Sequence, residues 1–245
     1  MDLKESRVQS HAQEGEWYDD VRFALLHSIT DGNPPERALD FGCGAGGLSS
    51  RMASRTGCRV TGYDPALTDT EIARLAELGV TATASTESLE HQTFDLVLLM
   101  DVLEHVDDPA GLLADACSYV RPRGRLVITV PAYRWLWSSH DVSLGHVDRY
   151  TKPRLQALCR SAGTGFRTTA SGYAFPSLLA GAAPVRTFER IKRGNRRPDD
   201  VSQMADESPG MATALRKVAT SDVRAVGCRS PFGLTCVQVM ERAGP

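Results

Sequence analysis

The sequence predicts an α/β fold built around a parallel sheet. Short apolar runs alternate along the chain with segments whose apolar residues recur at helical spacing, which is the pattern of strands joined by helices. A glycine-rich segment, residues 40–47, begins within the first apolar run. With 245 residues and 42% apolar content, the chain can bury the core of one domain with extensions.

The first half of the chain predicts three strands and two helices. The apolar runs that read as strands are residues 37–41, 58–64 and 80–84. The helices between them are residues 46–56 and 70–78. Gly57 and Gly79 follow the two helices directly, where glycine is favoured. Thr68 and Glu71 have the spacing of a capping box, which starts the second helix.

The second half adds four strands, and three helices lie between them. The strands are predicted at residues 94–100, 125–131, 165–173 and 234–240. Asp108 and Pro109 supply an N-cap and a first-turn proline for a helix that continues to Val120. The other helices are predicted at residues 152–162, capped by Thr151, and around residues 211–226.

The composition excludes several classes of protein. Lys and Arg number 28 against 30 Asp and Glu, and the net charge of −2 argues against a nucleic-acid binder. The six cysteines are dispersed without a Cys-x-x-Cys pair, which predicts reduced thiols in the cytoplasm. The first residues lack the apolar run of a secretory signal. No window approaches the roughly 20 apolar residues that a membrane-spanning helix needs.

The glycine-rich segment predicts a site for an adenosine-containing ligand. Gly42, Gly44 and Gly47 satisfy the pattern G-x-G-x-x-G, and the helix that follows offers free N–H groups. Asp64 closes the second strand, where a carboxylate can accept hydrogen bonds from both hydroxyls of a ribose. Asp40 lies at the start of the segment, where it would repel a pyrophosphate and attract an ammonium group.

At these residues the chain resembles the class I S-adenosylmethionine-dependent methyltransferases. The segments that match, in order, are LDFGCGAG, VTGYD, FDLVLLMDVLEHVDDP and RPRGRLVITVP, within about residues 15–172, together with the final strand. The resemblance implies a Rossmann-like sheet of seven strands in the order 3-2-1-4-5-7-6, with the last strand antiparallel. It also implies that a methyl group moves from S-adenosylmethionine to a nucleophile, leaving S-adenosylhomocysteine.

We expect one methyltransferase domain over residues 1–245. Its expected parts are an N-terminal lid helix in residues 1–34, a cofactor-binding core in 35–173, a helical insertion in 174–230, and a last strand with a tail in 231–245.

The resemblance assigns roles to residues around the glycine-rich turn. The implied cofactor-binding residues are Trp17, Tyr18, Asp40, Gly42, Gly44, Gly46, Asp64, Pro65, Ser85, Thr86, Met100, Asp101, Leu103 and His105. Asp40 would orient the methionine amino group and Asp64 would hold the ribose. Ser85 stands where the family has an adenine-contacting aspartate. Trp17 and Tyr18 would cover the sulfonium, although both could instead be core aromatics of the lid helix.

The stretch after the fifth strand, residues 131–151, is the candidate acceptor site. Its expected substrate-binding residues are Tyr133, Trp135, Trp137, Arg149 and Tyr150. His140 and His146 are the candidate general bases, because imidazole can accept a proton near neutral pH. Alternatively, the ionisable residues hold the loop in place. We expect no metal site, since the spacing of His140, His146 and Asp148 is not distinctive.

The pattern S-x-H-D-x-x-x-G-H-x-x-R-Y-T within this stretch resembles a generic subgroup of methyltransferases that act on small molecules. That subgroup usually has arginine where this chain has Asp148.

The segment after the sixth strand is the least regular. Residues 174–194 join an apolar half, interrupted by two prolines, to a basic half, and residues 195–210 read as a mobile loop. Residues 174–197 could rest on an anionic membrane surface or hold a phosphorylated acceptor, although a solvated helix face explains the same charges.

We therefore predict a cytoplasmic S-adenosylmethionine-dependent methyltransferase, a monomer or homodimer, that acts on a small molecule such as a secondary metabolite. The first alternative is a methyltransferase whose acceptor is lipid-linked or phosphorylated and lies at a membrane surface. The second is of another class: an NAD(P)-dependent oxidoreductase or a non-catalytic cofactor-binding module.

Overall fold

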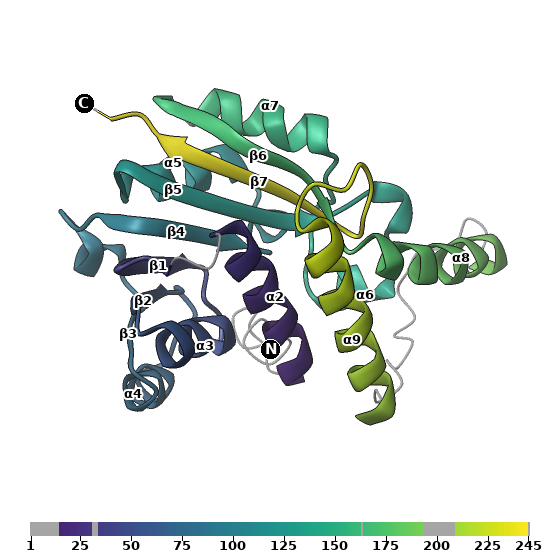
Figure 1. The fold of residues 1–245 in the computed structure, drawn as a ribbon, viewed down its shortest axis with the longest axis horizontal. Helices are drawn as coiled ribbons and strands as arrows, with labels where there is room; N and C mark the ends of the chain where they lie inside the picture. The colour runs from purple at the N-terminus through teal and green to yellow at the C-terminus, as the bar shows by residue number, and fades with distance from the viewer. Residues whose placement is uncertain (1–14, 31–33, 163, 194–208, 245) are drawn as a thin grey trace.

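The computed structural model describes residues 15–30, 34–162, 164–193 and 209–244, with backbone alone for 15, 16, 185–193, 209, 211 and 212. In this part of the chain seven strands form one sheet of order β3-β2-β1-β4-β5-β7-β6 (Figure 1). The strands are β1 Arg37–Phe41, β2 Arg59–Tyr63, β3 Val80–Thr83, β4 Phe94–Met100, β5 Val120–Pro131, β6 Phe166–Ala174 and β7 Thr235–Arg242. β7 is antiparallel to both of its neighbours. The predicted fold class and strand order are confirmed.

Helices cover both faces of the sheet. They are α2 Gly15–Ile29, α3 Gly47–Thr56, α4 Asp69–Glu77, α5 Pro109–Ser118, α6 Ser139–Ser143, α7 Lys152–Ala162, α8 Pro176–Arg193 and α9 Pro209–Val226. Short 3₁₀ turns in the described residues are η1 Thr86–Leu89, η2 Leu103–His105 and η3 Arg134–Leu136. α2, α3 and α9 pack on one face with residues such as Leu25, Met52 and Val223. α5 and α7 pack on the other with Leu113 and Leu155.

β4 lies in the middle of the sheet because its side chains are apolar on both faces. Leu96 and Leu98 belong to the core under α2 and α3, whereas Val97 and Leu99 belong to the core under α5 and α7. A parallel strand covered by helices on both sides has this nearly continuous apolar sequence.

Local capping signals fix several helix ends as predicted. Thr68 Oγ1 accepts a hydrogen bond from Glu71 N, and the Glu71 carboxylate accepts one from Thr68 N, so the capping box starts α4. Asp108 caps α5, and Pro109 is its first residue. The expected helix to Val120 is too long, because Val120 pairs with Phe94 and begins β5. Pairing with a central strand overrides the helical pattern there.

The proline-containing segment forms a longer helix than its sequence suggests. α8 runs without interruption past Pro184. Pro176 begins the helix, where the missing N–H has no helical acceptor. Pro184 lies inside, at the cost of one backbone hydrogen bond. Of the loop expected at 195–210, residues 195–208 lie outside the described residues, and Pro209 and Gly210 belong to α9.

Among the residues that the structure describes, none of the helices is both long and apolar enough to cross a membrane.

Candidate functional site

The turn after β1 is held against the end of β2. The backbone N–H groups of Gly42 and Cys43 both donate to the Tyr63 carbonyl, at 2.7 and 2.9 Å. Gly42 has a φ of +91°, and a Cβ there would lie 2.7 Å from Val102 Cγ2. Glycine is therefore needed both for the backbone conformation and for the close approach of the loop after β4.

Asp64 is fixed at the mouth of this turn. Its Oδ2 accepts a hydrogen bond from Gly44 N at 3.0 Å, and its Oδ1 accepts one from Ala66 N at 2.9 Å. A carboxylate has about four lone-pair positions, so both oxygens can still accept hydrogen bonds from a ligand. These backbone N–H groups therefore set the orientation of the carboxylate to which two adjacent hydroxyls of a ligand would donate.

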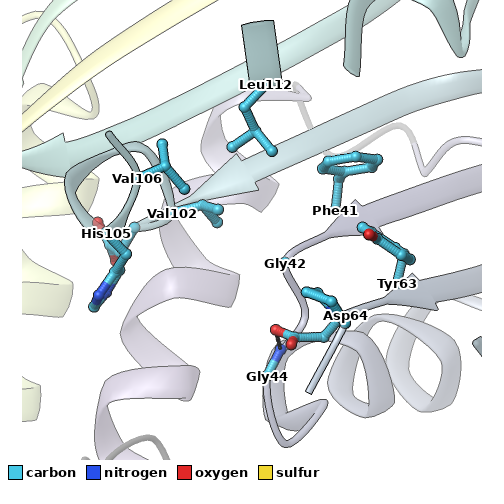
Figure 2. Close-up of a pocket in the computed structure, with 11 residues that line it drawn as sticks. Phe41, Gly42, Gly44, Tyr63, Asp64, Val102, His105, Val106 and Leu112 are labelled. Carbon is cyan, nitrogen blue, oxygen red and sulfur yellow. Dashed lines mark hydrogen bonds between the residues drawn. The ribbon is translucent and has the colours of Figure 1, made fainter. Parts of the chain in front are cut away.

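A pocket of about 640 Å³, partly open to solvent, lies at the carboxyl ends of β1, β2 and β4. Its lining residues are Phe41, Gly42, Gly44, Tyr63, Asp64, Pro65, Asp101, Val102, His105, Val106 and Leu112 (Figure 2). Two carboxylates and one imidazole contribute to this wall, and none of its described residues is lysine or arginine.

The pocket brings six predicted cofactor residues together. They are Gly42, Gly44, Asp64, Pro65, Asp101 and His105. The predicted site residues did not include the apolar wall, which is formed by Phe41, Tyr63, Val102, Val106 and Leu112. The rings of Phe41 and Tyr63 lie 4.7 Å apart. In the sequence, this pair could have been recognised as aromatic residues at the ends of two adjacent parallel strands.

Asp101 connects the pocket to the N-terminal helix. Its backbone has a φ of +60°, an uncommon conformation for a non-glycine residue. Its Oδ1 accepts a hydrogen bond from Thr129 Oγ1 at 3.0 Å, and its Oδ2 accepts one from the Tyr18 hydroxyl at 2.9 Å. Arg22 Nε lies 3.6 Å from Oδ2.

Arg22 is a site residue that was not among the predicted ones. Its guanidinium donates to the Met100 carbonyl and lies among the carboxylates of Asp19, Asp40 and Asp101. Burial lowers the pKa of Arg22, but these carboxylates together raise it above its ordinary value. In the sequence, Arg22 could have been recognised as an arginine within the apolar pattern of the predicted lid helix.

Asp40 lies beneath the turn rather than on the pocket wall. It is 2% exposed and accepts a hydrogen bond from Ser49 Oγ at 2.6 Å. Burial raises the pKa of Asp40, and the Ser49 hydrogen bond and the Arg22 charge offset this only in part. Burial and the nearby carboxylates of Asp40 and Asp64 raise the pKa of the Cys43 thiol. We therefore interpret Cys43 as a packing residue.

The remaining predicted cofactor residues are not part of the described pocket wall. Met100 and Leu103 are buried in the two cores. Ser85 and Thr86 are exposed, and Ser85 Oγ accepts a hydrogen bond from Glu87 N at the start of η1. Gly46 precedes α3 in a left-handed conformation. Trp17 packs against the core beside Tyr18, with ring centroids 5.7 Å apart.

The stretch after β5 is organised around Asp141, which is fully buried. Arg149 donates to both of its oxygens, at 2.6 and 3.2 Å, and to the Ala132 carbonyl at 2.9 Å. Ser138 N donates to Asp141 at 2.8 Å, and His146 Nδ1 lies 2.9 Å from Asp141 Oδ1. Burial alone would raise the pKa of Asp141, but His146 and Arg149 hold it well below its usual range.

The predicted acceptor residues fall into two groups. Arg149 and Tyr150 are 6% and 2% exposed, and both bond to the protein's own backbone. Tyr133 stacks on Trp135 and on Tyr173, with ring centroids 5.8 and 5.2 Å away. Burial and the Tyr173 hydroxyl raise the pKa of Tyr133 to about 12.

Trp135 is 43% exposed, whereas Trp137 is half-buried. Of the two candidate bases, His146 contacts His105 of the pocket wall, with ring centroids 4.7 Å apart. His140 lies on α6.

A family model described as "Methyltransferase domain" matches residues 9–168. The chain belongs to this methyltransferase family. The match covers the turn after β1, β4 and the stretch after β5, and it confirms the resemblance seen in the sequence motifs.

Curated relatives of this methyltransferase-family chain match it over part of its length. The ubiquinone biosynthesis O-methyltransferase of Methylobacterium sp. (strain 4-46) is 43% identical over 93 residues, which are 35% of this chain and 37% of that protein. The chain spans between about a third and about half the length of the curated relatives that it matches.

Solved structures share the fold at low sequence identity. The plantazolicin methyltransferase BpumL in complex with SAH aligns with a TM-score of 0.59 and 12% identity over 96% of this chain and 89% of that one. The [4+2]-cyclase SpnF aligns with a TM-score of 0.56 and 18% identity over 92% and 81%. The same fold thus carries proteins named for different reactions.

Proposed function

We propose that this protein transfers a methyl group from S-adenosylmethionine to a small-molecule acceptor. The observation that carries the proposal is the charge of the pocket, where Asp64 and Asp101 face the cavity without a described lysine or arginine on its wall. S-adenosylmethionine has a sulfonium and an ammonium, which carboxylates attract. The same carboxylates disfavour the pyrophosphate of NAD(P), and with it the oxidoreductase alternative.

The residues of the pocket fit the parts of this cofactor. Asp64, oriented by Gly44, is proposed to accept hydrogen bonds from the ribose hydroxyls. Phe41 and Tyr63 offer an apolar wall to the adenine. Asp101 attracts the methionine amino group at the wall, and Asp40 attracts it from beneath the turn. Ser85 and Thr86 stay predictions.

Bound S-adenosylmethionine supplies an electrophilic methyl group, and the displaced sulfur keeps the electron pair of the broken bond. The protein's contribution is to align the acceptor with that methyl and to exclude water. Tyr18 and Arg22 hold α2 against Asp101, and this contact closes one side of the site. Trp17 lies on the same helix.

On the acceptor side, we propose that Tyr133, Trp135 and Trp137 form an aromatic wall. His140 or His146 takes the proton that a hydroxyl or amine acceptor loses. Arg149 and Tyr150 act by holding this wall in place, since their polar groups bond to the protein itself.

Partners and location also stay predictions. Membrane contact through residues 174–197 rests largely on side chains that the structure does not describe. All six cysteines are free thiols, and the cytoplasmic location stays a prediction.

Ligand-dependent melting tests the cofactor. S-adenosylhomocysteine should raise the melting temperature, because a ligand at 100 times its Kd adds about 2.7 kcal/mol to the free energy of unfolding. NAD should leave it unchanged. Asp64→Asn should lose most of the shift, whereas Asp115→Asn, at an exposed position on α5, should keep it. Stabilisation by NAD alone would contradict the proposal.

Turnover is tested with isotope-labelled S-adenosylmethionine and small-molecule extracts, by mass spectrometry of labelled products. A labelled product that depends on Asp64 supports the proposal. Cofactor binding with no labelled product from any extract points to the non-catalytic module.

A further inference from the structure

Behind the pocket wall lies a cluster of three residues that can bind a metal: Glu104, His105 and His146. Their candidate ligand atoms, one from each residue, all lie within 4.8 Å of one another. Glu104 is fully buried, and the side chain of His146 is 8% exposed. His105 also lines the pocket (Figure 2).

Backbone contacts hold the two segments of the cluster together. Glu104 and His105 belong to η2, directly after β4, whereas His146 follows α6. The N–H of Val147, next to His146, donates to the Glu104 carbonyl at 2.7 Å. The Tyr150 hydroxyl donates to the Leu103 carbonyl at 3.3 Å. The three side chains are therefore brought together before any ligand binds.

The hydrogen bond of His146 prepares one ring nitrogen for a cation. His146 Nδ1 lies 2.9 Å from Asp141 Oδ1 and can donate a hydrogen bond to this carboxylate. The lone pair is then on Nε2. Arg149 fixes Asp141 in turn. A carboxylate behind the second ring nitrogen is the usual support of a metal-binding histidine.

We propose that Glu104, His105 and His146 bind a divalent transition-metal cation, with Zn²⁺ as the best match. Two imidazoles and one carboxylate are a known ligand set for Zn²⁺, in which a fourth position stays open. Bonds of about 2.0–2.2 Å place tetrahedral ligands roughly 3.2–3.6 Å apart. The present separations are at most 4.8 Å, so the ligand atoms would have to approach one another by no more than roughly 1.6 Å.

Because His105 belongs to the pocket wall, the open position faces the site of methyl transfer. This role rests on the proposed function: the cation binds an acceptor oxygen and lowers the pKa of its hydroxyl. His146 is then a ligand of the cation, and His140 is the candidate that takes the proton. The binding of the cation itself does not depend on that function.

Calorimetric titration of the chelator-treated protein with Zn²⁺, without S-adenosylmethionine, tests the site. One equivalent should bind, and Glu104→Gln and His146→Ala should each weaken binding by at least about 100-fold. Asp141→Asn should weaken it about 10- to 100-fold. His27→Ala, which removes an exposed histidine on α2, should bind as the wild type does. Circular dichroism checks that each variant is folded.

The absorption spectrum of the Co²⁺ form gives a second readout in the wild type. Tetrahedral ligand-field bands without thiolate charge transfer support the site, since none of the three ligands is a cysteine. Thiolate bands, no defined stoichiometry, or full affinity in the Glu104 and His146 variants would overturn it. Failed methyl transfer by protein that still binds one Zn²⁺ would count against the proposed function and leave the site intact.

Discussion

The hydroxyl of Tyr18 donates a 2.9 Å hydrogen bond to the carboxylate of Asp101, 83 residues further along the chain. Tyr18 belongs to the N-terminal helix, whereas Asp101 directly follows β4 with a φ of +60° and lies on the pocket wall. The contact therefore couples the position of α2 to the state of the pocket.

Removal of this hydroxyl should loosen α2. Tyr18→Phe takes one donor from a charged acceptor, a loss of about 1.5–3 kcal/mol in the free energy of unfolding when the group is buried. Thr129 and Arg22 still contact Asp101, so the lower part of that range is expected. Hydrogen exchange of the α2 amides should accelerate, and Tyr119→Phe, on the opposite face of the sheet, should leave it unchanged. Equal protection of α2 in wild type and Tyr18→Phe would show that the contact carries no stability.

Gly42→Ala should damage the pocket sterically. Its Cβ would lie 2.7 Å from Val102 Cγ2 in a backbone of φ +91°. Gly57→Ala is the matched control, because Gly57 also has a positive φ (+71°) but no heavy atom within 4 Å of the added Cβ. The control should lose about 1–2 kcal/mol by backbone strain alone.

Gly42→Ala should lose more stability than that control in urea unfolding, and it should bind S-adenosylhomocysteine more weakly. The double variant Gly42→Ala/Val102→Ala should recover part of both. If the two glycine variants lose equal stability, the close approach of Val102 is unimportant.

Asp40→Asn should make the protein more stable and the cofactor less tightly bound. The folded-state pKa of Asp40 is raised above the ordinary value of 3.8. The folded state therefore holds the Asp40 proton more strongly than the unfolded state, and stability falls as the pH rises through that window. Asparagine has no proton to lose and avoids this cost.

Urea unfolding across a pH series checks the sign of this pH dependence of stability. The variant's advantage should be absent below the ordinary aspartate pKa and should grow as the pH rises above it. At pH 7, calorimetry should show weaker binding of S-adenosylhomocysteine. A variant that is less stable than the wild type at every pH would mean that Arg22 and Ser49 outweigh the cost of burial.

Arg149→Met should destabilise the stretch after β5. It leaves the fully buried carboxylate of Asp141 without its cationic partner, which costs about 3–5 kcal/mol in comparable pairs. Arg134→Met breaks an ion pair with Asp148 in which the arginine is 74% exposed, and such pairs contribute about 0–1 kcal/mol. Thermal unfolding should separate the two variants clearly. Similar melting temperatures would show that the Asp141 charge is compensated elsewhere.

Short-range patterns in the sequence predicted much of the fold. The capping box of Thr68 and Glu71, the N-cap at Asp108 and the buried strand at 94–100 each depend on residues close together in the chain. The early start of β5 was not visible in this way. It depends on pairing with β4, which no local pattern of residues 120–124 reports.

The same distinction between local and long-range features applies to the candidate site. The glycine-rich turn and Asp64 were predictable, because a turn and the strand end beside it have local signatures and the order of strands places them together. The contacts of Arg22 with Asp101 and of Asp141 with Arg149, and the cluster around His105, could not be predicted. The sequence by itself determined which elements form and where the cofactor turn lies. Only the tertiary structure decided which charges meet, because burial and distance between remote segments set the energy of a charge, and neither is encoded locally.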